Sequence, residues 1–282
     1  MEPQESGTPT TGPLDVGRRE ALSLGLFGAL ALAMVAGDAA LGSPHGAKPG
    51  RLAVRARPRA TRPIPSPRPT PVKPVPAKPV AAWTKPAFKV HDIVPGAPPN
   101  AIALTIDDGP HPEYTPRVLE LLAQHDVKAT FCLIGEQIQA NEKIVHMMAE
   151  AGHEIANHTW THPYNIARLT QARVELEISK AYQQIADVTG KNPGLFRSPG
   201  GVWSKRVLDA VARHGMAPLD WDNDPKDWTK PGTDHIIHAM LRGSAGDILL
   251  CHDGGGDRSE TLRALRTVVP RLKARGLQFV TL

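Results

Sequence analysis

The strongest constraint on the fold is an alternation of strand-like and helix-like segments that begins near residue 100 and runs to the C-terminus. Seven short apolar runs, of which AIALTID (101–107) is the first, alternate with six segments that carry apolar residues at helical spacing. The clearest helical face follows Thr170 and comprises Val174, Ile178, Ala181, Ile185 and Val188. This order of elements predicts a parallel sheet with crossover helices.

The length of this part limits the choice of architecture. About 185 residues are too few for a complete eight-fold barrel. We therefore expect an α/β fold of the distorted, incomplete (β/α) barrel type, and a doubly wound open sheet is the alternative. In a barrel of this kind, active sites form at the carboxyl ends of the strands, so polar residues at those ends are the first candidates for a functional site.

The first 91 residues have a different composition. Residues 39–91 contain eleven Lys and Arg and no Asp or Glu, and PIPSPRPTPVKPVPAKPV spaces its prolines too closely for a helix or a sheet. We expect residues 43–91 to be a disordered, extended linker and residues 92–282 to form the folded domain. That domain has 20 basic and 23 acidic residues, so the high pI belongs to the tail and does not indicate nucleic-acid binding.

Residues 1–42 have the layout of an export signal or signal anchor. Residues 21–37 are apolar and uncharged, follow Arg18 and Arg19, and precede small residues. An uncleaved anchor is the second choice, because a spanning helix needs about 20 apolar residues. The paired arginines are compatible with twin-arginine export. We expect a secreted or cell-wall-associated protein whose membrane contact, if it has one, runs through residues 21–37.

The chain has two cysteines, Cys132 and Cys251, and each lies in an apolar run. Two cysteines are too few for a disulfide framework, even in an exported protein. We expect both to be buried thiols.

Ionisable residues collect where the expected strands end. The residues in question are Asp107 and Asp108 after the first strand, His158 and His162 after the third, Arg197 at the fourth, Asp222 to Asp227 after the fifth, and His252 at the sixth. The first pair lies in TIDDGP, which by itself is equally typical of a turn. Five unrelated turns would not be expected to gather ionisable groups on one rim, so we predict a single functional site there.

The two histidines of HTWTH are four residues apart, which turns both imidazoles to one side on a helix or tight loop. Together with a carboxylate they suit Zn²⁺ or another divalent ion and leave positions open for water and substrate. A closed structural zinc site would need four protein ligands. A non-haem iron oxygenase also uses two histidines and a carboxylate, but its carboxylate normally comes two residues after a histidine.

Five motifs, TIDDGP, HTWTH, RSPGG, DPKDW and LLCH, occur in the order found in the polysaccharide deacetylases. The chain resembles this NodB-like group, carbohydrate esterase family 4, from about residue 98 to residue 282. The resemblance implies a distorted (β/α)7 barrel, which agrees with the strand count. It also implies that residues 92–282 are a catalytic domain.

Carried over to this chain, the family pattern implies that Asp107 is the catalytic base and that Arg197 orients it. It implies that Asp108, His158 and His162 bind the metal ion. The two adjacent aspartates would then differ in role, because one must stay free to accept a proton while its neighbour binds the cation.

The same resemblance implies that His252 is the general acid and that Asp227 holds its imidazole. Gly200 would supply a backbone N–H to the oxyanion, and Trp228 and Leu250 would line the sugar groove. The family usually has an aromatic residue at position 200, where this chain has glycine, which puts one wall of that groove in doubt.

The sequence therefore predicts a hydrolase, dependent on zinc or on cobalt or another divalent ion, that removes N-acetyl groups from N-acetylglucosamine residues of an acetylated glycan. Peptidoglycan and chitin-type chains are the candidate substrates, and we expect a monomer. The alternatives are an acetylxylan-type O-deacetylase and a catalytically silent wall-binding module. Four ionisable residues are expected to be structural or solvated, His111, His125, His153 and Glu154, and three stay unassigned, Trp221, Asp222 and Asp224.

Overall fold

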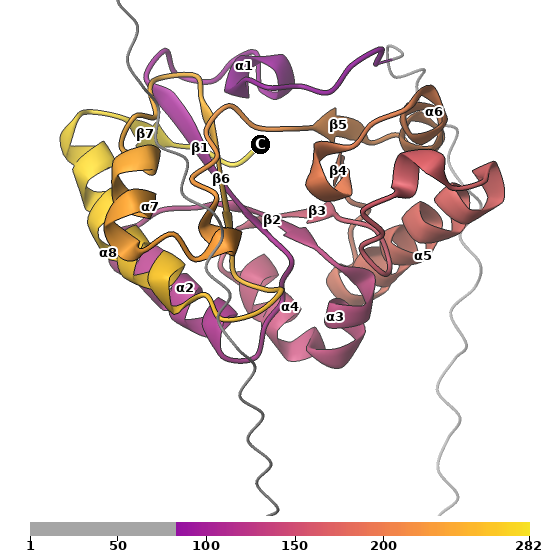
Figure 1. Ribbon diagram of the computed structural model, residues 1–282, viewed down its shortest axis with the longest axis horizontal. Helices are drawn as coiled ribbons and strands as arrows, with labels where there is room; N and C mark the ends of the chain where they lie inside the picture. Colours follow the sequence, from indigo (N-terminus) through magenta and orange to yellow (C-terminus); the bar gives the residue numbers. More distant parts are fainter. Residues whose placement is uncertain (1–82) are drawn as a thin grey trace, which may run out of the picture. The chain divides into compact units, whose positions relative to one another are not determined.

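The computed structural model describes residues 83–282, and Figure 1 shows their fold. Its centre is a parallel sheet of seven strands with the order β5-β4-β3-β2-β1-β6, and β7 pairs with the start of β1. The strands are β1 (Ala101–Asp107), β2 (Thr130–Leu133), β3 (Glu154–Asn157), β4 (Leu195–Arg197), β5 (Ala217–Leu219), β6 (Ile248–His252) and β7 (Gln278–Phe279). All seven strand-like runs of the sequence therefore form strands.

The helices form an arc along the outer side of this sheet, from α8 through α2 and α4 to α5 (Figure 1). The helices of the described residues are α1 (Val90–Ile93), α2 (Tyr114–Gln124), α3 (Gly135–Ala140), α4 (Glu142–Glu150), α5 (Gln171–Thr189), α6 (Lys205–Arg213), α7 (Thr233–Met240) and α8 (Ser259–Ala274), and α1 is not part of this arc. Two predicted helix starts are confirmed, because the side chains of Thr170 and Ser204 accept hydrogen bonds from backbone N–H groups in the first turn. The short helices α1 and α3 were not predicted, since they are too brief to show a periodicity.

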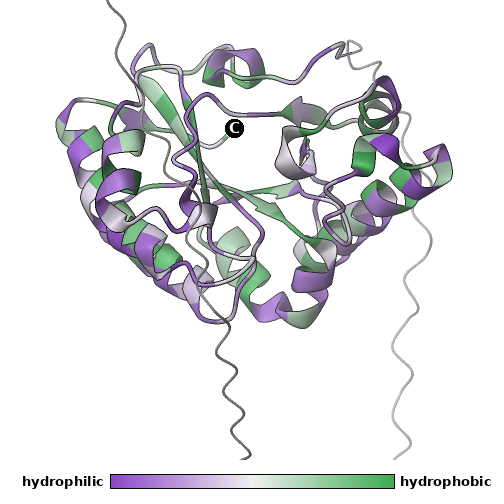
Figure 2. Ribbon diagram, in the orientation of Figure 1, coloured by the Kyte–Doolittle hydropathy of each residue, from purple (hydrophilic) through white to green (hydrophobic). Residues whose placement is uncertain are grey.

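The two faces of β1 have different surroundings. Ile102, Leu104 and Ile106 join the large apolar cluster under the helices, whereas Ala101 and Ala103 face a smaller cluster formed mainly by the strands. Because side chains alternate along a strand, Asp107 lies on the same inner face as these two alanines. The strands are largely hydrophobic and the helices carry their polar residues on the outside (Figure 2).

The sheet curls without closing through regular strand pairing. Isolated bridges span the opening between β5 and β6: Ala87 pairs with Leu219, Lys89 with Asp247, and Asn223 with Leu249. The prediction of a distorted, incomplete barrel is confirmed. The doubly wound alternative is wrong, because the long helices pack on one face only, and the other is covered by α1 and the C-terminal residues.

The N-terminal boundary of the folded part lies earlier than the sequence analysis placed it. Ala87 and Val90 are buried, and both belong to the segment assigned to the linker. Their contacts are with β5 and with the loop before β6, which are distant in sequence. A segment of so few residues has no periodicity that could reveal this packing.

The remaining N-terminal predictions, the signal, the twin-arginine motif and most of the linker, lie outside the described residues. Within residues 83–282, no helix is both long enough and apolar enough to cross a membrane. Cys132 and Cys251 are free and buried, as predicted.

Candidate active site

The carboxyl ends of the strands surround a cavity of about 360 Å³. The residues that line it are Asp107, Asp108, Ile134, His158, His162, Tyr164, Gly200, Trp221, Asp224, Lys226, Trp228, Leu250, His252, Gly255 and Arg258. Register explains part of this convergence, because Asp107 at the end of β1 pairs directly with His252 at the end of β6. The parallel sheet thus brings motifs from distant parts of the chain to one face.

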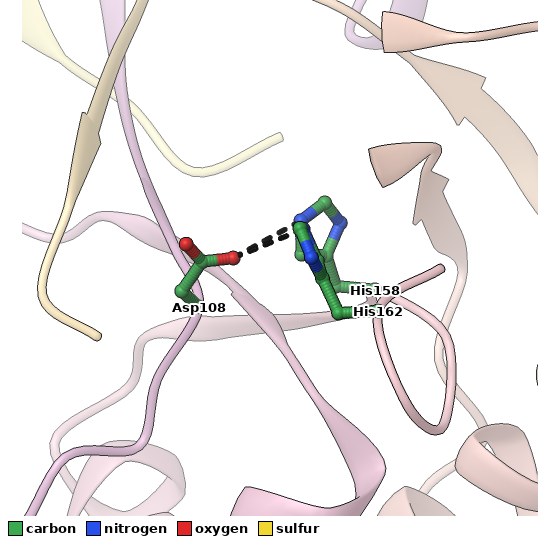
Figure 3. A group of neighbouring side chains, drawn as sticks. All are labelled: Asp108, His158 and His162. Atoms are coloured by element: carbon green, nitrogen blue, oxygen red, sulfur yellow. Dashed lines mark ion pairs between the residues drawn. The ribbon is translucent and has the colours of Figure 1, made fainter. Parts of the chain in front are cut away.

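Asp108, His158 and His162 form a compact cluster in this cavity. Figure 3 shows the carboxylate of Asp108 directed at both imidazoles. Its Oδ1 lies 3.5 Å from Nε2 of His158 and 3.2 Å from Nε2 of His162, and one ligand atom from each residue lies within 4.8 Å of the others. Three donors of this kind fit a divalent cation with open coordination positions.

The hydrogen bonding of His158 supports this assignment. Its Nδ1 lies 2.9 Å from the carbonyl oxygen of Arg197, and a carbonyl oxygen only accepts, so Nδ1 carries a proton. In the neutral imidazole this leaves a lone pair on Nε2, which points at the carboxylate of Asp108. Oδ1 of Asp108 is buried and has no hydrogen-bond partner. A buried carboxylate oxygen without a hydrogen-bond partner, beside two imidazole nitrogens, is the expected arrangement for a metal site.

The protonation states agree with metal binding. Burial lowers the pKa of His162 to about 4, so its ring is neutral at pH 7. Burial raises the pKa of Asp108, but the neighbouring histidines outweigh this and hold it below the usual range of a carboxyl group. Asp108 and His162 are therefore in the forms that bind metals.

Backbone strain occurs at two of the three residues of this cluster and at Thr159, which follows the third. Asp108, Thr159 and His162 all have positive φ angles, of 72°, 70° and 58°. Left-handed backbone is uncommon for residues other than glycine and occurs preferentially at functional sites. This strain turns Asp108 away from the direction that continued strand geometry would give it.

Two side chains that the sequence analysis missed hold the HTWTH loop. Glu177, buried on α5, accepts hydrogen bonds from the backbone N–H and the hydroxyl of Thr161, at 2.8 and 2.9 Å. Asn157 accepts from the N–H of Thr159 at 2.9 Å and donates to the carbonyl of Ile178. The sequence contained a sign that Glu177 is buried, because this residue lies within the apolar stripe of α5 that contains Val174 and Ile178.

Asp107 forms a buried ion pair with Arg197. Nη1 of Arg197 donates to Oδ1 of Asp107 at 2.7 Å and to the hydroxyl of Thr105 at 2.7 Å, while Nη2 donates to the carbonyl of Asp220. Arg197 is fully buried, so both members of this pair are shielded from solvent. The second oxygen of Asp107 lies 3.7 Å from Nε2 of His158, on the side of the proposed metal ligands.

His252 pairs with Asp227 on another wall of the cavity. Nδ1 of His252 donates to Oδ1 of Asp227 at 2.7 Å, and Oδ2 accepts from the N–H of His252 and the hydroxyl of Thr261. Burial favours neutral His252, but the hydrogen bond and negative charge of Asp227 outweigh it and raise the pKa to about 9. His252 is therefore protonated at neutral pH and can act as an acid.

The three residues predicted to contact the substrate also line the cavity. Leu250 is buried, whereas Trp228 is half exposed. Gly200 lies in a short 3-10 turn, η2 (Pro199–Gly201), with a φ of 61°. The structure thus brings every predicted site residue to one cavity or, for Arg197 and Asp227, directly behind it.

The residues without an assigned role separate into two groups. Trp221 and Asp224 line the cavity, and Asp224 forms an ion pair with Lys226. Asp222 instead pairs with Lys89 and lies away from it. The four residues expected to be structural or solvated do not line the cavity: His111, His125, His153 and Glu154.

Comparison with known proteins identifies the family. The family model of the polysaccharide deacetylases matches residues 95–219. A peptidoglycan-N-acetylglucosamine deacetylase of Bacillus cereus is 41% identical over 183 residues, covering 64% of this chain and 85% of the relative. A chitooligosaccharide deacetylase of Bradyrhizobium sp. is 39% identical over 192 residues, covering 64% and 87%.

A solved structure agrees with these sequence relatives. The crystal structure of a peptidoglycan N-acetylglucosamine deacetylase with a bound benzamide derivative superposes with a TM-score of 0.64 at 33% identity, covering 69% of this chain and 89% of that one. The family match, the relatives and the shared fold agree with the five motifs and with the cavity they form. This chain therefore belongs to the polysaccharide deacetylase family, carbohydrate esterase family 4.

Proposed function

We propose that this protein is a metal-dependent N-deacetylase that hydrolyses the acetamide of N-acetylglucosamine residues in a cell-wall glycan and releases acetate. The observation that carries the proposal is that one cavity holds two groups able to transfer protons, each with a partner of opposite charge. Asp107, the proposed base, forms an ion pair with Arg197, and His252, the proposed acid, forms one with Asp227. Between them the chain presents a three-residue cluster suited to a divalent cation.

The metal ligands in this proposal are Asp108, His158 and His162. A divalent cation held by them supplies Lewis-acid chemistry, because it polarises a carbonyl oxygen and makes a nearby water easier to deprotonate. Zinc suits a site of two histidines and one carboxylate, and cobalt or another divalent ion fits the same donors.

The proton transfers belong to the protein. Asp107 accepts the proton of the attacking water through the carboxylate oxygen that Arg197 does not bind. His252 donates a proton to the nitrogen when the C–N bond breaks, so that the products are acetate and a free amine. Asp227 keeps His252 charged until that step.

The remaining contacts position the acetyl group and the sugar. The backbone N–H of Gly200 is proposed to donate to the oxygen that becomes negative in the tetrahedral intermediate. Leu250 suits the acetyl methyl group because it is apolar and lines the cavity. Trp228 offers an aromatic face to the C–H surface of the sugar ring.

Peptidoglycan is the substrate we propose first. The Bacillus cereus relative bears that substrate in its name, and a cationic, proline-rich tail is suited to passing through an anionic wall. Chitin-type oligomers are the second substrate class, after the Bradyrhizobium relative. We further propose that the protein is exported through residues 1–42 and acts as a monomer at the cell surface.

Acetate release tests the function. The protein is assayed on peptidoglycan, on N-acetylglucosamine oligomers and on O-acetylated xylan, each before and after chelation and after addition of zinc. We expect release from the N-acetylated glycans, loss on chelation and recovery with zinc. Release from xylan alone would make the protein an O-deacetylase, and full activity after chelation would remove the metal from the mechanism.

Cell fractionation tests the location. The full chain, with a reporter at its C-terminus, is expected in the surface or secreted fraction. Replacing Arg18 and Arg19 together by lysine should keep it inside the cell if twin-arginine export is used. Export of this double variant at the normal level would contradict that route.

A further inference from the structure

Tyr164 is an unassigned aromatic side chain at the mouth of the cavity. Among the large hydrophobic side chains of residues 83–282 it is the most exposed, at 71%, and Trp228 follows at 52%. These two line the cavity, whereas the exposed Phe88 lies away from it, near the start of the described chain. Exposed aromatic rings in a cavity are a common feature of ligand sites, because covering them with a ligand removes apolar area from water.

The position of Tyr164 is tied to the metal cluster. It follows His162 by two residues, and the two rings lie with centroids 4.7 Å apart and planes at 89°. Such an edge-to-face contact is favourable and orients both rings. Tyr164 is therefore held beside the cluster while most of its surface stays open to a ligand.

The ring of Tyr164 lies beside Gly200. A methyl group added at Gly200 would lie 3.6 Å from Cδ1 of Tyr164 and 3.8 Å from Cγ2 of Val202. The ring of Tyr164 thus covers the space beside residue 200, where this chain has no side chain of its own. An aromatic side chain from another loop therefore lines the cavity at the place where the family resemblance predicts an aromatic residue at position 200.

We propose that Tyr164 is a specificity-determining residue that stacks on a sugar unit next to the one being deacetylated. This inference rests on the proposed function. The substituents of a β-1,4-linked N-acetylglucosamine ring are equatorial, so both faces of the ring present C–H groups. The negative face of an aromatic ring attracts such polarised hydrogens. With Trp228 at the same cavity, the glycan meets aromatic surfaces from two separate loops.

Binding measurements test this inference without depending on turnover. In an Asp107→Asn background with zinc present, calorimetry gives the Kd of the N-acetylglucosamine tetramer. Tyr164→Ala is expected to raise the Kd by about 5- to 30-fold, as for an aromatic ring that the bound ligand covers. Tyr164→Phe keeps the ring and should stay within about twofold. Phe88→Ala, which removes an exposed ring away from the cavity, should leave the Kd unchanged.

Chain length provides a second readout. Because Tyr164 contacts a neighbouring unit, the Kd of monomeric N-acetylglucosamine should change by less than about twofold in Tyr164→Ala. An unchanged Kd for the tetramer in Tyr164→Ala would overturn the inference. An equal loss in Tyr164→Phe would also overturn it, since the hydroxyl and not the ring face would then make the contact.

The outcomes separate this inference from the proposed function. If the Asp107→Asn protein bound the tetramer through Tyr164 but the unsubstituted protein released no acetate from it, the proposed function would fail and the stacking site would stand. If the unsubstituted protein released acetate and Tyr164→Ala bound normally, only the inference would fail. No binding of the tetramer by the Asp107→Asn parent would overturn the inference itself.

Discussion

Asp107 and Arg197 form an ion pair across the inner face of the sheet, with Nη1 of Arg197 2.7 Å from Oδ1 of Asp107. The two residues end β1 and β4, which are separated in the sheet by β2 and β3. The pair therefore links strands that share no hydrogen bonds. It orients the proposed base and also connects two distant strands of the curled sheet. Breaking the pair should therefore change the free energy of unfolding as well as the activity.

Replacing Arg197 by alanine should lower the free energy of unfolding by about 3–5 kcal/mol, because it leaves the buried carboxylate of Asp107 without its partner. Arg213→Ala is the matched control, since Arg213 is half exposed and its pair with Glu175 lies at the surface. There we expect a change below about 1 kcal/mol. Urea denaturation of both variants measures the difference, and equal small losses would show that the Asp107–Arg197 pair is not structurally important.

The two adjacent aspartates should respond differently to substitution. Asp107→Asn keeps the three proposed ligands but cannot accept a proton, so metal should remain bound while kcat falls by roughly 10²- to 10⁴-fold. Asp108→Ala removes a ligand, so metal content and activity should fall together. Metal analysis and kinetics on the same preparations test both statements. Loss of metal from Asp107→Asn with retention in Asp108→Ala would reverse the assigned roles.

Asp227→Asn should lower the pKa of His252. The amide cannot stabilise the imidazolium, while burial continues to favour the neutral ring, so we expect a fall from about 9 to below the ordinary value of about 6.5. NMR titration in the chelated protein measures this, because a bound cation would itself lower the pKa. In the metal-loaded Asp227→Asn enzyme, activity should be lost at a lower pH than in the unsubstituted enzyme, because His252 loses its proton at a lower pH. An unchanged titration would show that Asp227 does not hold the charge.

The same pair predicts a pH dependence of stability. Because the folded-state pKa of His252 is raised, protonated His252 contributes stability that is fully present below pH of about 6.5 and lost as the pH rises through about 9. The chelated Asp227→Asn protein should lose this part of the pH dependence. Thermal unfolding of both proteins between pH 6 and pH 10 is the measurement.

Glu177→Ala should weaken metal binding without touching a ligand. It leaves the N–H of Thr161 without its acceptor and frees the loop that carries His158 and His162. For a residue that supports ligands in this way we expect a loss of about 10- to 100-fold in metal affinity. Glu175→Ala, two residues away on α5 and part of a surface ion pair, is the control and should bind metal normally. Equal affinities in the two variants would contradict a supporting role for Glu177.

Local patterns were sufficient to predict the elements and their order. The apolar runs and helical stripes identified seven strands and the main helices, and Thr170 and Ser204 cap α5 and α6 as predicted. The placement of Asp107 and His252 at strand ends also followed from sequence, because a residue directly after a buried strand lies at its end whatever the strand order. These features depend on residues close in the chain, and so a sequence records them.

The relations between distant segments depended on the tertiary structure. The contact between Arg197 and Asp107 follows from the curl and register of the sheet. So do the hydrogen bond that places a proton on Nδ1 of His158 and the position of Tyr164 beside Gly200. The packing of Ala87 against β5 is of the same kind, since its partner lies more than a hundred residues away. Sequence determined which chemical groups this protein carries at its strand ends. Only the fold, through long-range packing that no local pattern encodes, decided which of them touch.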